Sequence, residues 1–280
     1  MNELSLFTGA GGGLLASRLL GWSTVCAVEL EPYARKVLFQ RQAEGHLERF
    51  PIWDDVCTFD GNPWRNSVDI VSGGFPCQNI SAAGKHEGLA GKSSGLVYEM
   101  LRIVEEVQPR FVFAENSPHL RTNGLGAIVA TLTGMGYDCA WGVLGAWHTG
   151  APHKRNRLWL LAHANSHAVS KQSRRLGGQG RQGTANACRH GRKGHVPNAN
   201  GAQRKRDGGA FGIQAQHTNT SGTSWWQTEP AMDRVVNGFP GRLDELRAIG
   251  NAQVPQVAAL AFRVLSETLG ASTEAQDGKI

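Results

Sequence analysis

The chain has 280 residues, a formal net charge of +6 and a hydrophobic content of 40%, so it can bury a core without disulfides or a structural metal. Its five cysteines are an odd number with no Cys-x-x-Cys pair, which argues against a secreted disulfide framework and a thiolate-rich zinc site. Glu3 and the glycines between Gly9 and Gly13 exclude a signal peptide or spanning helix at the N-terminus. We therefore expect a soluble cytoplasmic protein with no metal and no membrane association.

Short apolar runs alternate with helical patterns over the first part of the chain. The runs predict strands at 4–7, 24–28, 68–72, 110–114 and 157–162, and the intervening patterns predict helices at 13–20, 32–42 and 96–107. Such alternation is typical of an α/β fold in which helices cover both faces of the sheet. We predict a doubly wound, largely parallel sheet within residues 1–162.

The first predicted strand runs into the glycine-rich turn of LSLFTGAGGG. Glycines there let backbone amides approach a nucleotide-like group at a helix N-terminus. Glu29 ends the next strand, where a carboxylate can bind two ribose hydroxyls, and Asp55 lies near the end of a further strand, within reach of an adenine amino group. These features predict a pocket for an adenosine-containing cofactor. Read from Gly11, the turn also fits the relaxed dinucleotide pattern, so a nicotinamide cofactor stays open.

Cys77 directly follows a proline at the end of an apolar run, in VSGGFPCQNIS. A position just beyond the carboxyl end of such a strand faces the ligand crevice, where a thiolate can act as a nucleophile; the alternative is an ordinary buried cysteine. Two patterns favour the nucleophile. Glu115 ends another strand and, if partly buried, can exchange a proton. Arg155 and Arg157 are two residues apart at the start of a predicted strand, so their side chains should point toward the same face of the sheet.

The composition changes from about residue 163. Residues 163–216 contain ten Lys or Arg residues and one acid, Asp207. This imbalance indicates a polyanionic partner such as nucleic acid; a solvated basic loop is the alternative. Beyond it, apolar residues between Val254 and Leu265 share one helical face, which predicts a last helix that returns to the first domain.

Several short motifs follow one another along the chain: the glycine turn, Glu29, Asp55, PCQ at 76–78, ENS at 115–117, HKRNR at 153–157 and GNAQVP at 250–255. Their order strongly resembles that of the DNA (cytosine-5-)methyltransferases, over roughly residues 3–162 and 246–268. The resemblance implies the Rossmann-like fold of S-adenosylmethionine-dependent methyltransferases. It divides the chain into a catalytic and cofactor-binding domain at 1–162, a small basic target-recognition region at 163–245 and a returning C-terminal segment at 246–280. Ser5, Ser117 and His153 depart from the usual pattern without removing a group that the chemistry needs.

The resemblance also implies roles for individual residues. Cys77 would add to carbon 6 of a flipped cytosine in double-stranded DNA, Glu115 would contact the base, and Arg155 and Arg157 would support the base and Glu115. The implied cofactor is S-adenosyl-L-methionine, and its pocket would be formed by Phe7, Gly9, Gly11, Gly12, Glu29, Asp55, Asn251 and Val254. No obligate protein partner is evident. An RNA-directed enzyme of the same family, an inactive nucleic-acid-binding protein and a nicotinamide enzyme remain as alternatives.

Overall fold

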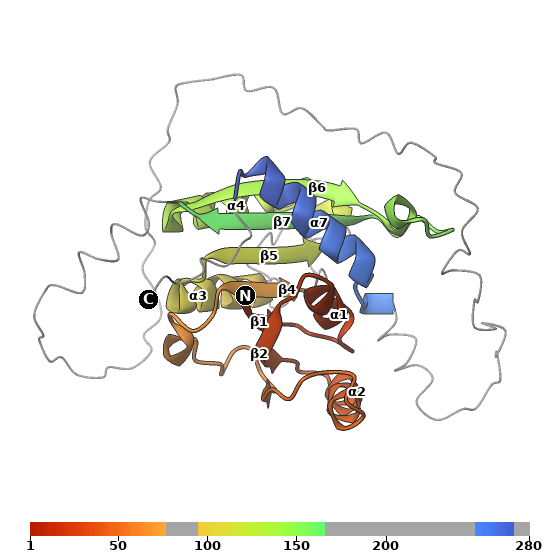
Figure 1. Ribbon diagram of the computed structural model, residues 1–280. Helices are drawn as coiled ribbons and strands as arrows, with labels where there is room; N and C mark the ends of the chain where they lie inside the picture. The colour runs from red at the N-terminus through yellow and green to blue at the C-terminus, as the bar shows by residue number, and fades with distance from the viewer. Residues whose placement is uncertain (77–94, 166–249, 272–280) are drawn as a thin grey trace, which may run out of the picture.

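The computed structural model describes residues 1–76, 95–165 and 250–271 (Figure 1). Within these ranges, seven strands form one sheet in the order β3-β2-β1-β4-β5-β7-β6. The strands are β1 (Asn2–Leu6), β2 (Ser23–Val28), β3 (Ile52–Trp53), β4 (Ile70–Gly74), β5 (Phe111–Asn116), β6 (Tyr137–Leu144) and β7 (Arg157–Ala164). Strands β1 to β5 run parallel, whereas β7 is antiparallel to both of its neighbours. The predicted α/β fold with a doubly wound, largely parallel sheet is confirmed.

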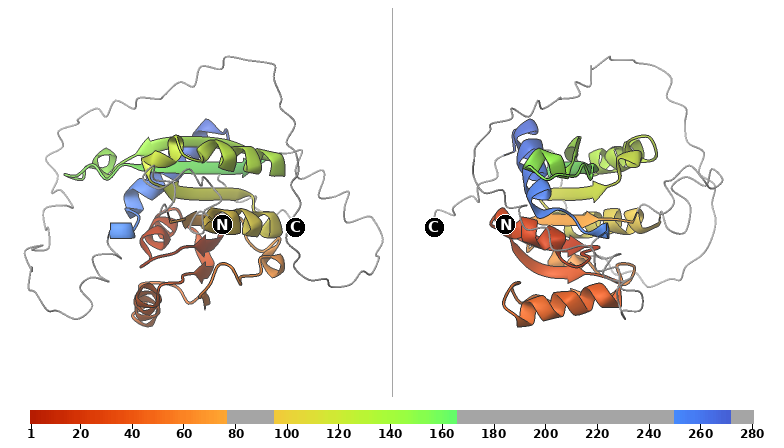
Figure 2. Two further views of the ribbon diagram at one scale, coloured as in Figure 1. Left: turned by 180° about the vertical axis from the view of Figure 1, so that it is seen from behind. Right: turned by 90° about the vertical axis from the view of Figure 1, so that its right-hand side faces the viewer.

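Helices cover both faces of this sheet. The described helices are α1 (Gly12–Leu19), α2 (Pro32–Ala43), α3 (Gly95–Val107), α4 (Leu125–Met135) and α7 (Pro255–Thr268), with short 3-10 turns η1 (Asn62–Trp64), η3 (Pro118–Arg121) and η4 (Ala146–Thr149). Figure 2 shows α1 and α7 on one side of the sheet and α3 and α4 on the other. None of the described helices is long and apolar enough to cross a membrane.

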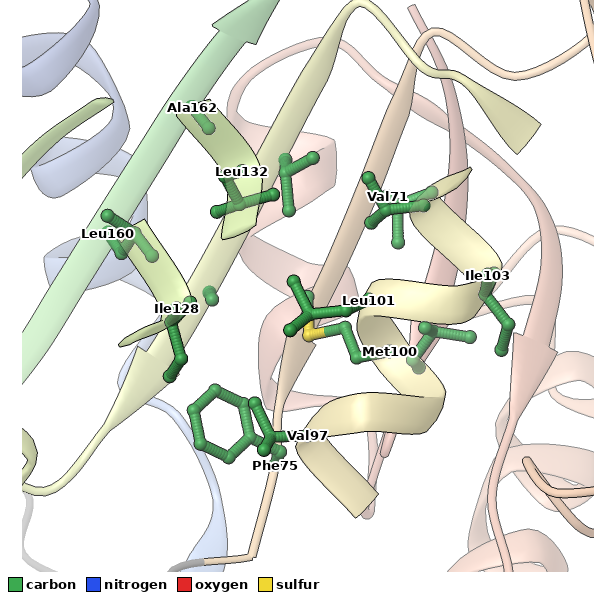
Figure 3. Close-up of a cluster of buried hydrophobic side chains, with 14 of the residues drawn as sticks. Val71, Phe75, Val97, Met100, Leu101, Ile103, Ile128, Leu132, Leu160 and Ala162 are labelled. Atoms are coloured by element: carbon green, nitrogen blue, oxygen red, sulfur yellow. The ribbon is translucent and has the colours of Figure 1, made fainter. Parts of the chain in front are cut away.

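The central strand β5 shows how the two faces are built. All six of its residues are buried, as expected for a strand covered on both sides. Phe111 and Phe113 contact Phe262 of α7 through edge-to-face ring contacts. Val112 and Ala114 point the other way and belong to the apolar cluster formed with α3 and α4. Figure 3 shows other members of this cluster, such as Leu101 of α3 and Leu132 of α4. By the same alternation, Glu115 belongs to the α7 face and Asn116 to the α3 face.

The last described helix packs against the first helix of the chain. Helix α7 packs against α1, β6 and β7, and it buries Val257, Ala258, Ala261 and Leu265, which lie on the face that the sequence predicted. The predicted domain boundaries stay a prediction, because most of residues 163–245 lies outside the described residues. The packing of α7 nevertheless brings residues 250–254 to the first half of the sheet.

Candidate active site

The predicted site residues that the structure describes gather at one edge of the sheet. In the strand order, the chain leaves β1 toward β2 on one side and later returns to β4 on the other. Ligands bind in open α/β sheets at the carboxyl ends of the strands where the order reverses in this way. The glycine turn follows β1, Glu29 follows β2, Asp55 follows β3 and Glu115 lies near the end of β5.

The glycine turn has the backbone geometry that its residues were expected to allow. Gly9 and Gly11 have φ angles of +59° and +93°, in the left-handed region that favours glycine. Phe7, with a φ of +52°, adopts the same region without being a glycine, a strained conformation that clusters at functional sites. A Cβ placed on Gly9 would meet no atom within 4 Å, so the space beside this residue is open.

Glu29 is fixed against this turn. Its Oε2 accepts a hydrogen bond of 2.6 Å from the amide of Gly9, and its Oε1 accepts one of 2.8 Å from the amide of Glu31. The residue is 9% exposed, so its carboxylate is held with little freedom. A carboxylate oxygen can accept more than one hydrogen bond, so both Glu29 oxygens can still accept hydrogen bonds from the hydroxyl groups of a ligand.

Asp55 lies two residues beyond β3, at the same edge. Its Oδ1 accepts a hydrogen bond of 2.9 Å from the amide of Cys57, which closes a turn typical of aspartate. With Glu29 and the open space at Gly9, the donor and acceptor set fits an adenosine-containing cofactor. Asn251 is exposed and Val254 half-buried, in the segment that precedes α7.

Glu115 is a buried carboxyl that forms an ion pair with Arg157. It is 8% exposed, and its Oε1 lies 2.9 Å from Nε of Arg157. Burial raises the pKa of Glu115 to about 6, although the charges of Arg157 and Arg155 and a hydrogen bond from Gln253 oppose the shift. A carboxyl with this pKa can donate a proton near neutral pH.

Arg155 and Arg157 have different partners. Arg157 begins β7 and pairs with Glu115, whereas Arg155 precedes the strand with a φ of +34°. One Arg155 nitrogen donates hydrogen bonds to the carbonyl oxygens of Gly250, at 2.7 Å, and Ala252. Arg155 therefore anchors the C-terminal segment beside the site and acts on Glu115 through its charge.

Cys77 lies outside the described residues, and its predicted role stays a prediction. The chain is described up to Pro76, and Phe75 is held by Asn116, whose Nδ2 donates a hydrogen bond of 2.9 Å to the Phe75 carbonyl. Asn116 is 3% exposed and directly follows Glu115. The segment that leads toward Cys77 is thus tied to the strand that carries Glu115.

Asn116 and Gln253 are two residues to which the sequence analysis gave no role. Both lie inside motifs that it identified, ENS and GNAQVP, and these motifs were the available signal. What the motifs alone did not reveal is the contact of each residue: Asn116 with the backbone before Cys77, and Gln253 with Glu115.

The doubly wound sheet and the polar residues at its carboxyl edge define a Rossmann-like α/β fold with a candidate site for an adenosine-containing cofactor. The sequence model of the C-5 cytosine-specific DNA methylase family matches residues 1–229. The chain belongs to this family, which confirms the resemblance that its motifs indicated.

Several curated relatives share this part of the chain. The Type II methyltransferase M.CviJI of Paramecium bursaria Chlorella virus IL3A is 35% identical over 161 residues, 57% of this chain and 42% of that protein. The Type II methyltransferase M.Eco47II of Escherichia coli is 35% identical over 167 residues, 58% of this chain and 39% of that protein. The match therefore spans about two fifths of the length of these relatives.

Among solved structures, the Entamoeba histolytica methyltransferase EhMeth is similar with a TM-score of 0.51 at 17% identity, over 59% of this chain and 53% of that one. At this identity the similarity supports the fold alone.

Proposed function

We propose that this chain transfers a methyl group from S-adenosyl-L-methionine to carbon 5 of cytosine in double-stranded DNA. The observation that carries the proposal is the buried Glu115 paired with Arg157 at the carboxyl edge of the sheet, in a chain of the C-5 cytosine-specific DNA methylase family. Curated relatives named as Type II methyltransferases support a role in DNA modification. We place this activity in the cytoplasm.

The proposed reaction begins with the base outside the duplex, since its ring atoms are otherwise stacked and out of reach; flipping costs a few kcal/mol. The Cys77 thiolate forms a bond to carbon 6, while Glu115 donates a hydrogen bond or proton to ring nitrogen 3 and so stabilises the negative charge that develops on the ring. Carbon 5 thereby becomes nucleophilic enough to take a methyl group. The carbon 5 proton then passes to water, which restores the double bond between carbons 5 and 6 and expels the Cys77 thiolate. The Glu115 carboxylate takes back any proton that it gave to ring nitrogen 3.

The pKa of Glu115 suits this role. With a pKa of about 6, the carboxyl is partly protonated near neutral pH, whereas an ordinary glutamate would be almost fully ionised. Arg157 orients the carboxyl through Oε1 and keeps the pKa from rising further. We expect activity that requires protonated Glu115 to fall as the pH rises through this pKa.

When bound, S-adenosyl-L-methionine supplies an electrophilic methyl group on a sulfonium centre. In our proposal Glu29 binds the ribose hydroxyls and Asp55 the adenine amino group. The remaining pocket residues are those of the glycine turn and the C-terminal segment: Phe7, Gly9, Gly11, Gly12, Asn251 and Val254. Residues 163–245 would recognise the DNA site, mainly through phosphate contacts from Lys and Arg.

The experiment is methyl transfer from labelled S-adenosylmethionine to duplex DNA and, in parallel, to transfer RNA, followed by digestion to nucleosides. Label in 5-methyldeoxycytidine supports the proposal. Label in RNA alone, or in neither polymer despite cofactor binding, contradicts it. S-adenosylmethionine should also raise the melting temperature and NAD should not, which separates the nicotinamide alternative.

The covalent step has its own test. Duplex DNA with 5-fluorocytosine at the target cannot lose a proton from carbon 5, so it should trap the Cys77 adduct as a species stable to denaturation. Cys77→Ala should abolish the adduct. Cys139→Ala is the matched control, because Cys139 lies within β6 and packs against the apolar core. An adduct that survives Cys77→Ala would show that another group is the nucleophile.

A further inference from the structure

We propose that Gln253 is a positioning residue that holds the Glu115 carboxyl from the side opposite Arg157 and ties it to the glycine turn. The inference rests on the proposed function, because it assigns Gln253 to the residue that acts on the base. Gln253 reaches the site from the segment between the Arg155-anchored residues 250–252 and α7.

One side of Gln253 lies against the start of α1. A Cβ on Gly12 would lie 2.5 Å from the Gln253 carbonyl oxygen and 3.1 Å from its backbone nitrogen. A Cβ on Gly13 would lie 3.0 Å from Gln253 Oε1. Any other residue at position 12 would overlap the Gln253 backbone. Packing against Gln253 therefore requires glycine at this position, independently of the proposed cofactor binding.

The side-chain amide nitrogen of Gln253, Nε2, lies at the ends of β4 and β5. A Cβ on Gly74 would lie 2.8 Å from Glu115 Oε2 and 3.3 Å from Gln253 Nε2, so these two groups meet over Gly74. A side-chain hydrogen bond joins Gln253 to Glu115 and opposes the rise of the Glu115 pKa. Arg157 Nε occupies Oε1, so the carboxyl is held on both sides.

A neutral amide suits this position. It donates a hydrogen bond to the ionised carboxylate without adding a charge, so it orients Glu115 while leaving the pKa near neutral. The charged groups that act on Glu115 within the described residues are Arg157 and Arg155. A second buried carboxyl, Glu3, lines a small cavity with Gln253 on the same face, and its own pKa is raised by burial.

The test replaces the amide while keeping the volume, in Gln253→Met, and adds a like charge in Gln253→Glu. Gln256→Met is the matched control, three residues further along the chain. The first readout is the Glu115 pKa, measured by NMR of protein labelled with ¹³C at glutamate carboxyls and assigned with Glu115→Gln. It requires neither DNA nor methyl transfer.

We expect Gln253→Met to raise the Glu115 pKa by roughly one to two units, the effect of losing one hydrogen bond to a carboxylate. Gln253→Glu should raise it at least as far, and Gln256→Met should leave it unchanged. The alkaline limb of kcat/KM on duplex DNA should move to higher pH by the same amount in Gln253→Met.

A folded Gln253→Met or Gln253→Glu protein with an unchanged Glu115 pKa would overturn the inference, even if its melting temperature fell. The two proposals fail separately. If the NMR shift occurs while the wild-type protein methylates no duplex DNA, the proposed function is wrong and the positioning role of Gln253 stands.

Discussion

Gly12→Ala tests whether glycine is needed at position 12 for packing against Gln253 or only for cofactor binding. Ordinary van der Waals contact of a Cβ begins at about 3.4 Å, and the new methyl would lie 2.5 Å from the Gln253 carbonyl oxygen, so about 0.9 Å of movement is needed. The obstacle is backbone on both sides, which cannot rotate away. Overpacking of this kind typically costs about 1–3 kcal/mol, or roughly 2–12 °C in melting temperature for a domain of this size.

The assay is thermal unfolding combined with hydrogen exchange of the peptide that covers residues 250–271. If the methyl displaces Gln253, protection should fall in this peptide and at the amides of α1, without any cofactor present. Gly126→Ala is the control, because a Cβ there would meet no atom within 4 Å in helix α4 and should be neutral or stabilising by up to ~1 kcal/mol. Unchanged exchange and melting temperature in Gly12→Ala, with weaker S-adenosylmethionine binding only, would refute the packing argument.

Three further predictions concern Glu115 and its neighbours. Arg157→Gln should raise the Glu115 pKa above about 6 and move the alkaline limb of activity to higher pH; an unmoved limb would contradict the ion pair. Because burial raises the Glu115 pKa from 4.5 to about 6, its unfavourable ionisation should lower stability by roughly 2 kcal/mol as the pH rises from about 4.5 to above 6, and Glu115→Gln should remove this loss in urea titrations at several pH values. Asn116→Ala should cost about 1–2 kcal/mol by leaving the Phe75 carbonyl unpaired, and should lower kcat more than cofactor affinity; equal loss in both would argue against its link to Cys77.

Strong apolar runs made much of the sheet predictable. The five strands and the three helices for which the sequence analysis gave bounds are present, and so is the predicted last helix. The strands were recognisable because a strand buried on both faces reads as a continuous hydrophobic run. Strand β6 was missed, since Asp138 and Gly142 interrupt its apolar pattern and Trp141 is exposed at the sheet edge. Helix α4 was also missed, because its sequence LGAIVATLTGM combines glycine and threonine with little contrast between its faces.

The candidate-site residues that could be placed from the sequence pattern lie next to a predicted strand. Glu29 and Glu115 could be placed at the carboxyl edge because each ends an apolar run. The contact between Gln253 and Glu115 could not be predicted, since it joins positions far apart in the chain and depends on how α7 docks. The hydrogen bonds from Arg155 to the carbonyls of Gly250 and Ala252 could not be predicted for the same reason.

The different partners of the two arginines explain the state of Glu115. Two guanidinium groups paired directly with one carboxylate would favour its ionised form and draw its pKa downward. Among the described residues, Arg157 forms the ion pair with Glu115, whereas one nitrogen of Arg155 donates hydrogen bonds to the carbonyls of the C-terminal segment. Burial then outweighs the remaining attraction, and the pKa settles at about 6. By engaging a nitrogen of Arg155, the C-terminal segment holds this arginine in a contact other than an ion pair with Glu115. The hydrogen bond from Gln253 lowers the Glu115 pKa, but it adds no charge, and burial remains the largest effect.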